Sequence, residues 1–347
     1  MILDVLYIII GVTLVLVGAD RLTEGASSLA RRFGVPEIVI GLTIVACGTS
    51  APEFFVSLMS ALNGTPDMAV GNVVGSNIMN TMVIVGCAAV VAPMVISPST
   101  VKKDIPFSVG AALLLILLTA ADSNLSRIDG IILLVGFAGF MAYTLWQAKR
   151  SLPPTDNNVE CRVESVEFAT AHEQGQENVI ATAEARSALP LCSAKNSTLY
   201  TLRSALWILL GLAGLVFGSN LFVDSASSVA TSLGVSEGVI GLTIVAGGTS
   251  LPELATSVVA ARKGQSAIAI GNVIGSNVFN ILLILGATAA ISPLQMEGIT
   301  VIDMGVMMGS IVLVWLFSFT RYTVERWEGA VLVLGYAGYL AWLLSNV

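Results

Sequence analysis

Two glutamates, Glu53 and Glu253, lie within apolar segments where an acidic side chain is costly. Each ends the same motif, Gly-Thr-Ser-x-Pro-Glu, at residues 48–53 and again at 248–253. A charged side chain at the centre of a bilayer costs about 3 kcal/mol or more on insertion scales, and such residues usually mark ion pathways. We therefore expect protons and metal ions to neutralise the two glutamates and to compete for them.

The proline of each motif is expected to break the helix that carries it. Pro252 has no N–H and crowds the carbonyl of Gly248, and Leu251 before it is pushed away from helical geometry. The carbonyls of residues 46–48 and 246–248 should then lose their partners, which is costly in lipid. A bound cation would replace those partners.

A second motif, Gly-Asn-Val-x-Gly-Ser-Asn, follows each break at residues 71–77 and 271–277. The spacing i, i+4, i+8 places three polar residues of each copy on one helix face. They are Asn72, Ser76 and Asn80 in the first copy, and Asn272, Ser276 and Asn280 in the second. Together with the glutamates and carbonyls they form a set of hard oxygen ligands, which suits Ca²⁺ or Na⁺. Either motif alone is more often a kink or a packing face, but their joint recurrence favours an ion site.

Composition predicts an all-α polytopic membrane protein. Of the 347 residues, 55% are hydrophobic and only 11% are charged, and the mean hydropathy is +0.86; soluble domains carry about a quarter charged residues. Ten segments are apolar and long enough to span a bilayer. They are 2–25, 37–61, 67–91, 105–121, 128–148, 203–224, 237–261, 266–291, 301–319 and 328–346.

The motifs belong to a longer internal repeat, which predicts two membrane halves at residues 1–150 and 203–347. Five spans in each half force the second half to enter the membrane inverted, an architecture of many secondary transporters. Helices two and seven are the broken ones. Residues 151–202 are polar and acidic and are expected to be a flexible linker, with a small folded or regulatory insert as the alternative.

Basic residues predict the orientation of these spans. Outside the linker, eleven lysines and arginines fall on one side of the ten-span arrangement and only Arg127 on the other, with Arg21 in or at the end of the first span. The positive-inside rule then places both termini outside and the 151–202 linker in the cytoplasm. A multi-pass protein of the cell (inner or plasma) membrane is expected.

At these motifs the sequence resembles the sodium/calcium exchanger family of the cation/calcium antiporter superfamily, in its compact bacterial form. GTSAPE with GSNIMN, and GTSLPE with GSNVFN, look like the two alpha repeats of that family. The resemblance implies ten helices, of which the second, third, seventh and eighth enclose the ion sites. It also implies a transporter rather than an enzyme, which exchanges Ca²⁺ for Na⁺ by alternating access and needs no cofactor.

The resemblance also implies which residues bind the ions. Glu53 and Glu253 would be the central carboxylates shared by Ca²⁺ and Na⁺. The other implied ligands are hydroxyl, carbonyl or amide oxygens of Thr49, Ser50, Thr249, Ser250, Ser76, Asn80, Ser276, Asn280, Ala46 and Ala246. Some relatives, including potassium-dependent ones, carry aspartate where this chain has Asn280. With asparagine at both positions 80 and 280 the site has two acidic groups, which argues against potassium dependence.

Three other functions fit parts of the pattern. An H⁺/Ca²⁺ antiporter would use the same glutamates, and a passive cation channel would conduct without a counter-ion. An intramembrane hydrolase would need Ser50 or Ser250 as nucleophile, but no histidine lies in any span and no GxGD motif is present. No basic patch supports binding of nucleic acid, and no obligate protein partner is inferred.

Several other polar residues near the motifs each allow two interpretations. Ser57 and Ser257, one turn beyond the glutamates, would either help coordinate the ion or bond back to their own helix. For Asp20 and Glu24 in the first span, we favour interfacial anchoring or pairing with Arg21 over a role in lining an ion path.

Overall fold

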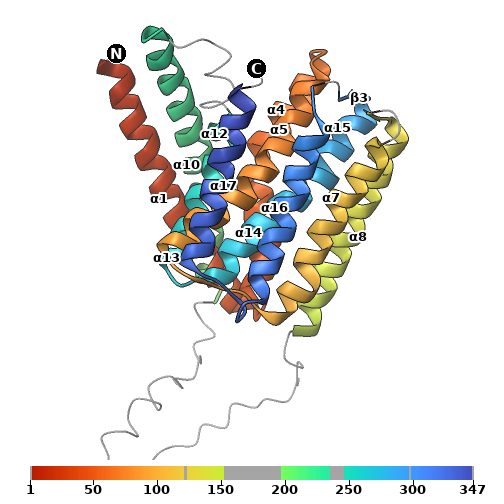
Figure 1. Ribbon diagram of the computed structural model, residues 1–347. Coiled ribbons are helices and arrows are strands. Elements are labelled where there is room, and N and C mark those ends of the chain that lie inside the picture. Colours follow the sequence, from red (N-terminus) through yellow and green to blue (C-terminus); the bar gives the residue numbers. More distant parts are fainter. Residues whose placement is uncertain (1, 121–122, 152–196, 235–245, 297, 346–347) are drawn as a thin grey trace, which may run out of the picture.

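The protein is a bundle of helices of very different lengths (Figure 1). The computed structural model describes residues 2–120, 123–151, 197–234, 246–296 and 298–345. Within these residues, seven helices are long and apolar enough to cross a membrane, or eight if one bent pair is counted as a single span. A multi-pass membrane protein is therefore confirmed, whereas the count of ten spans stays a prediction.

The elements of the two halves follow the chain in similar order. The first half contains α1 (Ile2–Phe33), α2 (Glu37–Ile40), η1 (Gly41–Val45), α3 (Ala46–Thr49), α4 (Ala51–Leu62), α5 (Pro66–Met79), η2 (Asn80–Ile84), α6 (Val85–Val91), η3 (Thr100–Asp104), α7 (Ile105–Thr119) and α8 (Arg127–Ser151), where η denotes a π-helical stretch. The second contains α10 (Ser197–Ser232), α12 (Ala246–Thr249), α13 (Leu251–Arg262), α14 (Ser266–Val278), η5 (Phe279–Leu285), α15 (Gly286–Ile291), α16 (Val301–Phe319) and α17 (Arg326–Ser345).

Two parts of the predicted arrangement lie partly outside the described residues. Most of the linker falls in 152–196, although α10 already begins at Ser197. The first part of the predicted seventh span, 237–245, is likewise outside. The predicted fourth span corresponds to α7, which is preceded by the π-helical stretch η3.

The predicted helix breaks are present, but one residue earlier than expected. α3 and α4 meet at Ser50 (φ −83°, ψ 7°), where the helix axis bends by 46°. Ser250 has the same conformation (φ −89°, ψ 4°) between α12 and α13. The expectation that Leu251 leaves helical geometry was wrong, since Leu251 is the first residue of α13. A proline in the first turn of a new helix removes no needed N–H, so the helix restarts ahead of it.

Glycines hold several helices of the two halves in close contact. α1 and α10 lie side by side at one edge of the bundle (Figure 1). A Cβ atom added to Gly11 would lie 2.8 Å from the carbonyl oxygen of Gly218, and one added to Gly18 would lie 2.8 Å from that of Gly211. Such distances leave no room for any side chain, so the two backbones pack directly on each other.

Contacts between the halves occur in reciprocal pairs: where a helix of the first half contacts a helix of the second, the equivalent helices contact each other with the halves interchanged. α6 packs through Gly86 on Gly329 of α17, and α15 packs through Gly286 on Gly130 of α8. Four short strands repeat the pattern. β1 (Met94–Val95) pairs antiparallel with β4 (Thr323–Val324), and β2 (Asn124–Leu125) with β3 (Leu294–Gln295).

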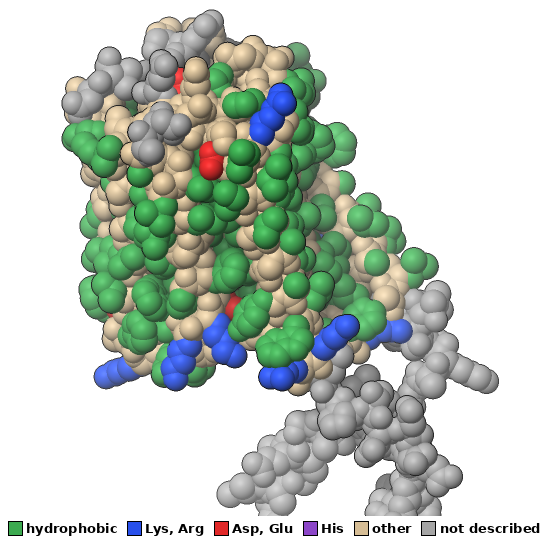
Figure 2. Space-filling view, turned by 90° about the vertical axis from the view of Figure 1, so that its right-hand side faces the viewer, with side chains coloured by type: hydrophobic (Ala, Val, Ile, Leu, Met, Phe, Trp, Pro, Cys, Tyr) green, Lys and Arg blue, Asp and Glu red, His purple; other side chains and the backbone are tan. Residues whose placement is uncertain are grey.

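The surface has an apolar middle and a basic end. Figure 2 shows hydrophobic side chains over most of one face, with Lys and Arg gathered mainly along one edge. α1 begins and α17 ends at the same end of the bundle (Figure 1). A wide band of exposed apolar side chains is what contact with lipid requires.

Candidate cation-binding site

The two helix breaks meet inside the bundle, and each contacts the glutamate of the other half. Ser50 Oγ donates to Glu253 Oε1 at 3.1 Å, and Ser250 Oγ lies 3.4 Å from Glu53 Oε1. Both glutamates are fully buried, and both serines are at most 3% exposed. The structure thus brings the two acidic groups into one enclosed site.

The polar faces of α5 and α14 complete the walls of this site. Ser276 Oγ lies 3.4 Å from Glu253 Oε1, and the hydroxyls of Ser76 and Ser250 are 3.1 Å apart. Asn280 Nδ2 donates to Ser76 Oγ at 3.2 Å. All of these side chains are buried, so the predicted stripe does face the breaks rather than lipid.

Four oxygen atoms in this site are buried without a hydrogen-bond partner among the described residues. They are Oε2 of Glu53, Oε2 of Glu253, Oδ1 of Asn80 and Oδ1 of Asn280. A buried acceptor left unpaired typically costs about 1–3 kcal/mol. Carboxylate and carboxamide oxygens are the ligands that Ca²⁺ and Na⁺ prefer, so each of these atoms is chemically suited to such a cation.

The remaining predicted ligands are placed less uniformly. Thr49 Oγ1 lies 3.0 Å from Asn272 Oδ1 and 3.1 Å from the carbonyl of Val45, which makes it a bridge to α14. Thr249 ends α12 and is half-buried. Ala246 begins α12, at the edge of the described segment.

The expectation that the carbonyls at the breaks lack partners was wrong for two of them. The carbonyl of Ala46 accepts the N–H of Ser50 at 3.0 Å. The carbonyl of Gly248 accepts the hydroxyl of Ser219, which α10 supplies. Because only Ser50 departs from helical geometry, its N–H still reaches the carbonyl of Ala46. At Gly248 the missing backbone donor is replaced by the hydroxyl from the neighbouring helix α10. The carbonyl of Gly248 keeps a second lone pair for a cation, whereas Thr49 Oγ1 also lies 3.4 Å from the carbonyl of Ala46.

Asparagine amides and serine hydroxyls hold the backbone around each glutamate. Asn72 Nδ2 donates to the backbone carbonyl of Glu53 at 3.2 Å and to Ser57 Oγ at 2.9 Å. Asn272 makes the same two contacts with Glu253 and Ser257, at 3.3 and 3.0 Å. Ser57 in turn donates to the carbonyl of Ala69 on α5. Ser57 therefore neither bonds back to its own helix nor faces the ion, but ties α4 to α5.

Two buried asparagines of the site were missed from the sequence. Asn77 and Asn277 are at most 2% exposed and contact the carboxamides of Asn280 and Asn80, at 3.2 Å in each case. Both are the last residue of the repeated Gly-Ser-Asn motif, and this recurrence could have indicated that they belong to the site.

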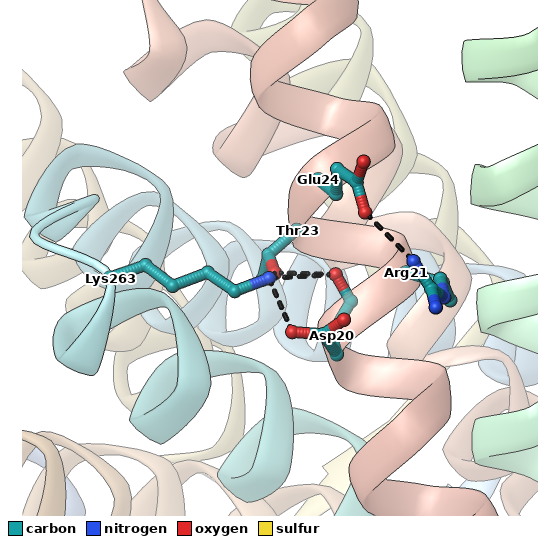
Figure 3. A network of polar contacts seen from close by, with 5 residues as sticks. All are labelled: Asp20, Arg21, Thr23, Glu24 and Lys263. Atoms are coloured by element: carbon teal, nitrogen blue, oxygen red, sulfur yellow. Dashed lines mark hydrogen bonds and ion pairs between the residues drawn. The ribbon is translucent and has the colours of Figure 1, made fainter.

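Asp20 and Glu24 take no part in this buried site. Arg21 pairs with Glu24 within α1 at 3.1 Å, in agreement with the prediction (Figure 3). Asp20 instead pairs with Lys263 at the end of α13, at 2.6 Å, and Lys263 also donates to Thr23 Oγ1. Asp20 and Lys263 are 44% and 30% exposed, so their ion pair is a surface link between α1 and α13.

Comparisons with known proteins identify the family of the chain. A family model described as sodium/calcium exchanger protein matches residues 3–146 and 203–345. The chain is 35% identical to a putative antiporter, CaxA, of Alkalimonas amylolytica, over the full length of both. It is 32% identical to the sodium/calcium exchanger MaX1 of Methanosarcina acetivorans, covering 96% of this chain and 97% of that one. A solved structure of the sodium-calcium exchanger NCX_Mj superimposes with a TM-score of 0.78 at 28% identity, covering 99% of each chain.

Proposed function

This chain belongs to the sodium/calcium exchanger family, and from that premise we propose that it exchanges Ca²⁺ for Na⁺ at the buried site around Glu53 and Glu253. Membership makes it a membrane transporter of the cation/Ca²⁺ antiport class. The observation that carries the finer proposal is the set of four unpaired buried oxygens, two from each half, which includes one oxygen of each glutamate.

Charge balance explains why one ion must replace another. Two buried carboxylates cannot both stay ionised and unpaired, because each would cost several kcal/mol in a medium without water. One Ca²⁺ or more than one Na⁺ neutralises the pair. A site that carries two uncompensated charges would not change its access, so net movement requires exchange.

We assign the hydroxyls and amides around the glutamates as further ligands. Ser50, Ser250, Ser76 and Ser276 lie within hydrogen-bonding distance of a glutamate or of one another, so their oxygens can turn toward an ion. Asn80 and Asn280 offer their unpaired Oδ1 atoms. Thr49, Thr249 and the carbonyls of Ala46 and Ala246 would complete the set, as the family resemblance implies.

The two halves are proposed to be inverted repeats of five spans each. The exchanged contacts support this: Gly86 meets Gly329 where Gly286 meets Gly130, and β1 meets β4 where β3 meets β2. A two-fold axis in the membrane plane would generate such reciprocal pairs. The basic edge in Figure 2 supports a cytoplasmic linker with both termini outside. α1 and α10 would then slide over the core as access alternates.

Transport into vesicles tests the proposal. Vesicles loaded with Na⁺ and diluted into Na⁺-free buffer should accumulate ⁴⁵Ca²⁺, and Glu253→Gln should reduce that uptake by on the order of 100-fold or more at low Ca²⁺ concentration. Glu24→Gln is the matched control, because Glu24 lies outside the site. Uptake driven by a pH gradient without Na⁺ would instead indicate H⁺/Ca²⁺ antiport. Flux that needs no counter-ion would indicate a channel, and undiminished exchange in Glu253→Gln would refute the assigned site.

A further inference from the structure

Asn77 and Asn277 make a set of contacts that the exchange reaction itself does not explain. We infer that they are positioning residues, which hold the carboxamides of Asn280 and Asn80 with their oxygens turned toward the cation. This inference rests on the proposed function, since it concerns how the same site recognises Ca²⁺.

The contacts cross from one half of the protein to the other. Asn80 Nδ2 donates to Asn277 Oδ1 at 3.2 Å, and Asn280 Nδ2 donates to Asn77 Oδ1 at 3.2 Å. All four side chains are at most 2% exposed. A carboxamide has one donor end and one acceptor end. Once its NH₂ group is bound to a neighbour, its oxygen must face the other way, and here that oxygen has no protein partner.

A chain of hydrogen bonds fixes the direction of this arrangement for Asn80. The Thr81 hydroxyl donates its only proton to the backbone carbonyl of Asn77 at 2.7 Å, and a carbonyl can only accept. Thr81 Oγ1 must then accept from Asn277 Nδ2, which lies 2.9 Å away. Asn277 is left to present its oxygen to Asn80, so Asn80 must present its NH₂ group.

The direction for Asn280 is fixed from the opposite side. Asn77 Nδ2 lies 3.9 Å from the thioether sulfur of Met307, which can accept a hydrogen bond but cannot donate one. Asn77 is therefore left with its oxygen toward Asn280. Asn280 Nδ2 has a second acceptor in Ser76 Oγ at 3.2 Å, so this carboxamide is held at two points where that of Asn80 is held at one.

The arrangement also discriminates between amide and acid at these positions. An ionised aspartate at 80 or 280 would place a carboxylate oxygen against the amide oxygen of Asn277 or Asn77, and two acceptors at about 3 Å repel each other, whereas a protonated, neutral aspartic acid could donate there. The cross-half contacts thus specify a neutral ligand at both positions. The site keeps two charges, and Ca²⁺ neutralises them without a third acid.

Kinetics of Ca²⁺ uptake test the inference. Asn277→Leu should raise the Ca²⁺ concentration for half-maximal uptake by about tenfold, the value of one well-placed hydrogen bond. Asn77→Leu should raise it less, because Ser76 still holds Asn280. Thr81→Val, which frees the Asn277 amide to rotate, should resemble Asn277→Leu in direction. Met307→Leu removes the acceptor that orients the Asn77 amide, so it should act in the same direction as Asn77→Leu but more weakly. Glu24→Gln, which removes a pair confined to α1, is the control.

Each outcome decides between positioning and mere stability. A purely structural role would lower the maximal rate per transporter while leaving the half-saturating Ca²⁺ concentration unchanged, and this would overturn the inference. If Asn277→Leu fails to reach the membrane, Thr81→Val provides the same readout. If the wild type shows no Na⁺-driven uptake, the proposed function fails. The inference is then judged separately from the Ca²⁺ dependence of the melting temperature of the purified variants.

Discussion

The two halves of the protein carry the same candidate ligands but surround them differently. Glutamate, serine and asparagine recur at equivalent positions in the breaks and in the facing helices. The asparagine contacts onto the glutamate backbones and across the halves recur as well. Other contacts around the site, the supports compared below, are present in one half only. Ser219 of α10 bonds the carbonyl of Gly248, whereas its counterpart in α1 is Ala19, which has no hydroxyl. Lys263 pairs with Asp20, whereas the equivalent positions hold Asn63 and Asn220.

This difference separates two kinds of constraint on the sequence. A single bound cation would touch both halves at once, so its chemistry imposes the same oxygen ligands on each. The identity of each supporting residue is set by local packing, and packing differs because each half has different neighbouring helices. Substitutions of ligands should therefore act alike in both halves, and substitutions of supports should act in one half alone.

The largest effect is expected where the halves are identical. Glu53→Gln and Glu253→Gln each remove one of two buried charges, and breaking a buried charge arrangement costs about 3–5 kcal/mol. Both should lower Ca²⁺ affinity by on the order of 100-fold or more, as measured by initial uptake rates over a range of Ca²⁺ concentrations. A large loss in one variant with near-normal affinity in the other would show that the halves are not equivalent at the site.

A smaller effect is expected for the buried acid of α16. Tyr339 donates to Asp303 Oδ1 at 2.6 Å, while the position equivalent to Tyr339 in the first half is Phe140. Tyr339→Phe should destabilise the protein by about 1–3 kcal/mol, the usual value for a hydrogen bond to a charged group. The melting temperature of the purified protein measures this.

Tyr336→Phe is the control for that substitution, because no hydrogen bond of the Tyr336 hydroxyl is present among the described residues. It should leave the melting temperature nearly unchanged. Half-saturating Ca²⁺ should be normal in both variants. A shift in Ca²⁺ affinity for Tyr339→Phe would mean that this support reaches the site after all.

The residues that gather at the buried site were largely predictable from the sequence, and the contacts that hold them there were not. Glu53 and Glu253 stood out because acids are costly in apolar segments, and the asparagine stripes followed from helical spacing. Those signals are local. Asn277 bonds Asn80 across the interface between the halves, and no spacing rule relates two such positions. The break lies at Ser50, one residue before the position expected from the proline. Proline restricts the residue before it, but it is tolerated in the first turn of a helix, and the prediction used only the first of these effects.

The support from Ser219 is expected to contribute about 1 kcal/mol. Hydrogen bonds between membrane helices average about 0.6 kcal/mol and reach about 1.7 kcal/mol. Ser219→Ala should therefore lower the melting temperature slightly, since the Gly248 carbonyl loses its donor. Ser232→Ala on the exposed part of α10 is the control, because Ser232 bonds only within its own helix. Equal shifts in the two variants would remove any special role for Ser219.

The smallest effect is expected for the ion pair of Asp20 with Lys263 (Figure 3). Exposed ion pairs contribute about 0–1 kcal/mol and are weakened by salt. The double variant Asp20→Asn with Lys263→Asn reproduces the neutral pair of the other half. A double-mutant cycle of the two single variants and the double variant should give a coupling energy below about 1 kcal/mol. The coupling is measured from the rate of Ca²⁺ uptake, at low ionic strength and again with choline chloride added.

That coupling would still be informative, because the pair links α1 to the end of α13, which follows the break and Glu253. If α1 slides during exchange, the link must open in each cycle, and its loss should change the uptake rate without changing half-saturating Ca²⁺. Glu24→Gln removes a pair confined to α1 and should change neither quantity. A coupling energy that persists at high ionic strength, or an altered Ca²⁺ affinity, would contradict this prediction. It would show that the Asp20–Lys263 contact affects ion binding itself.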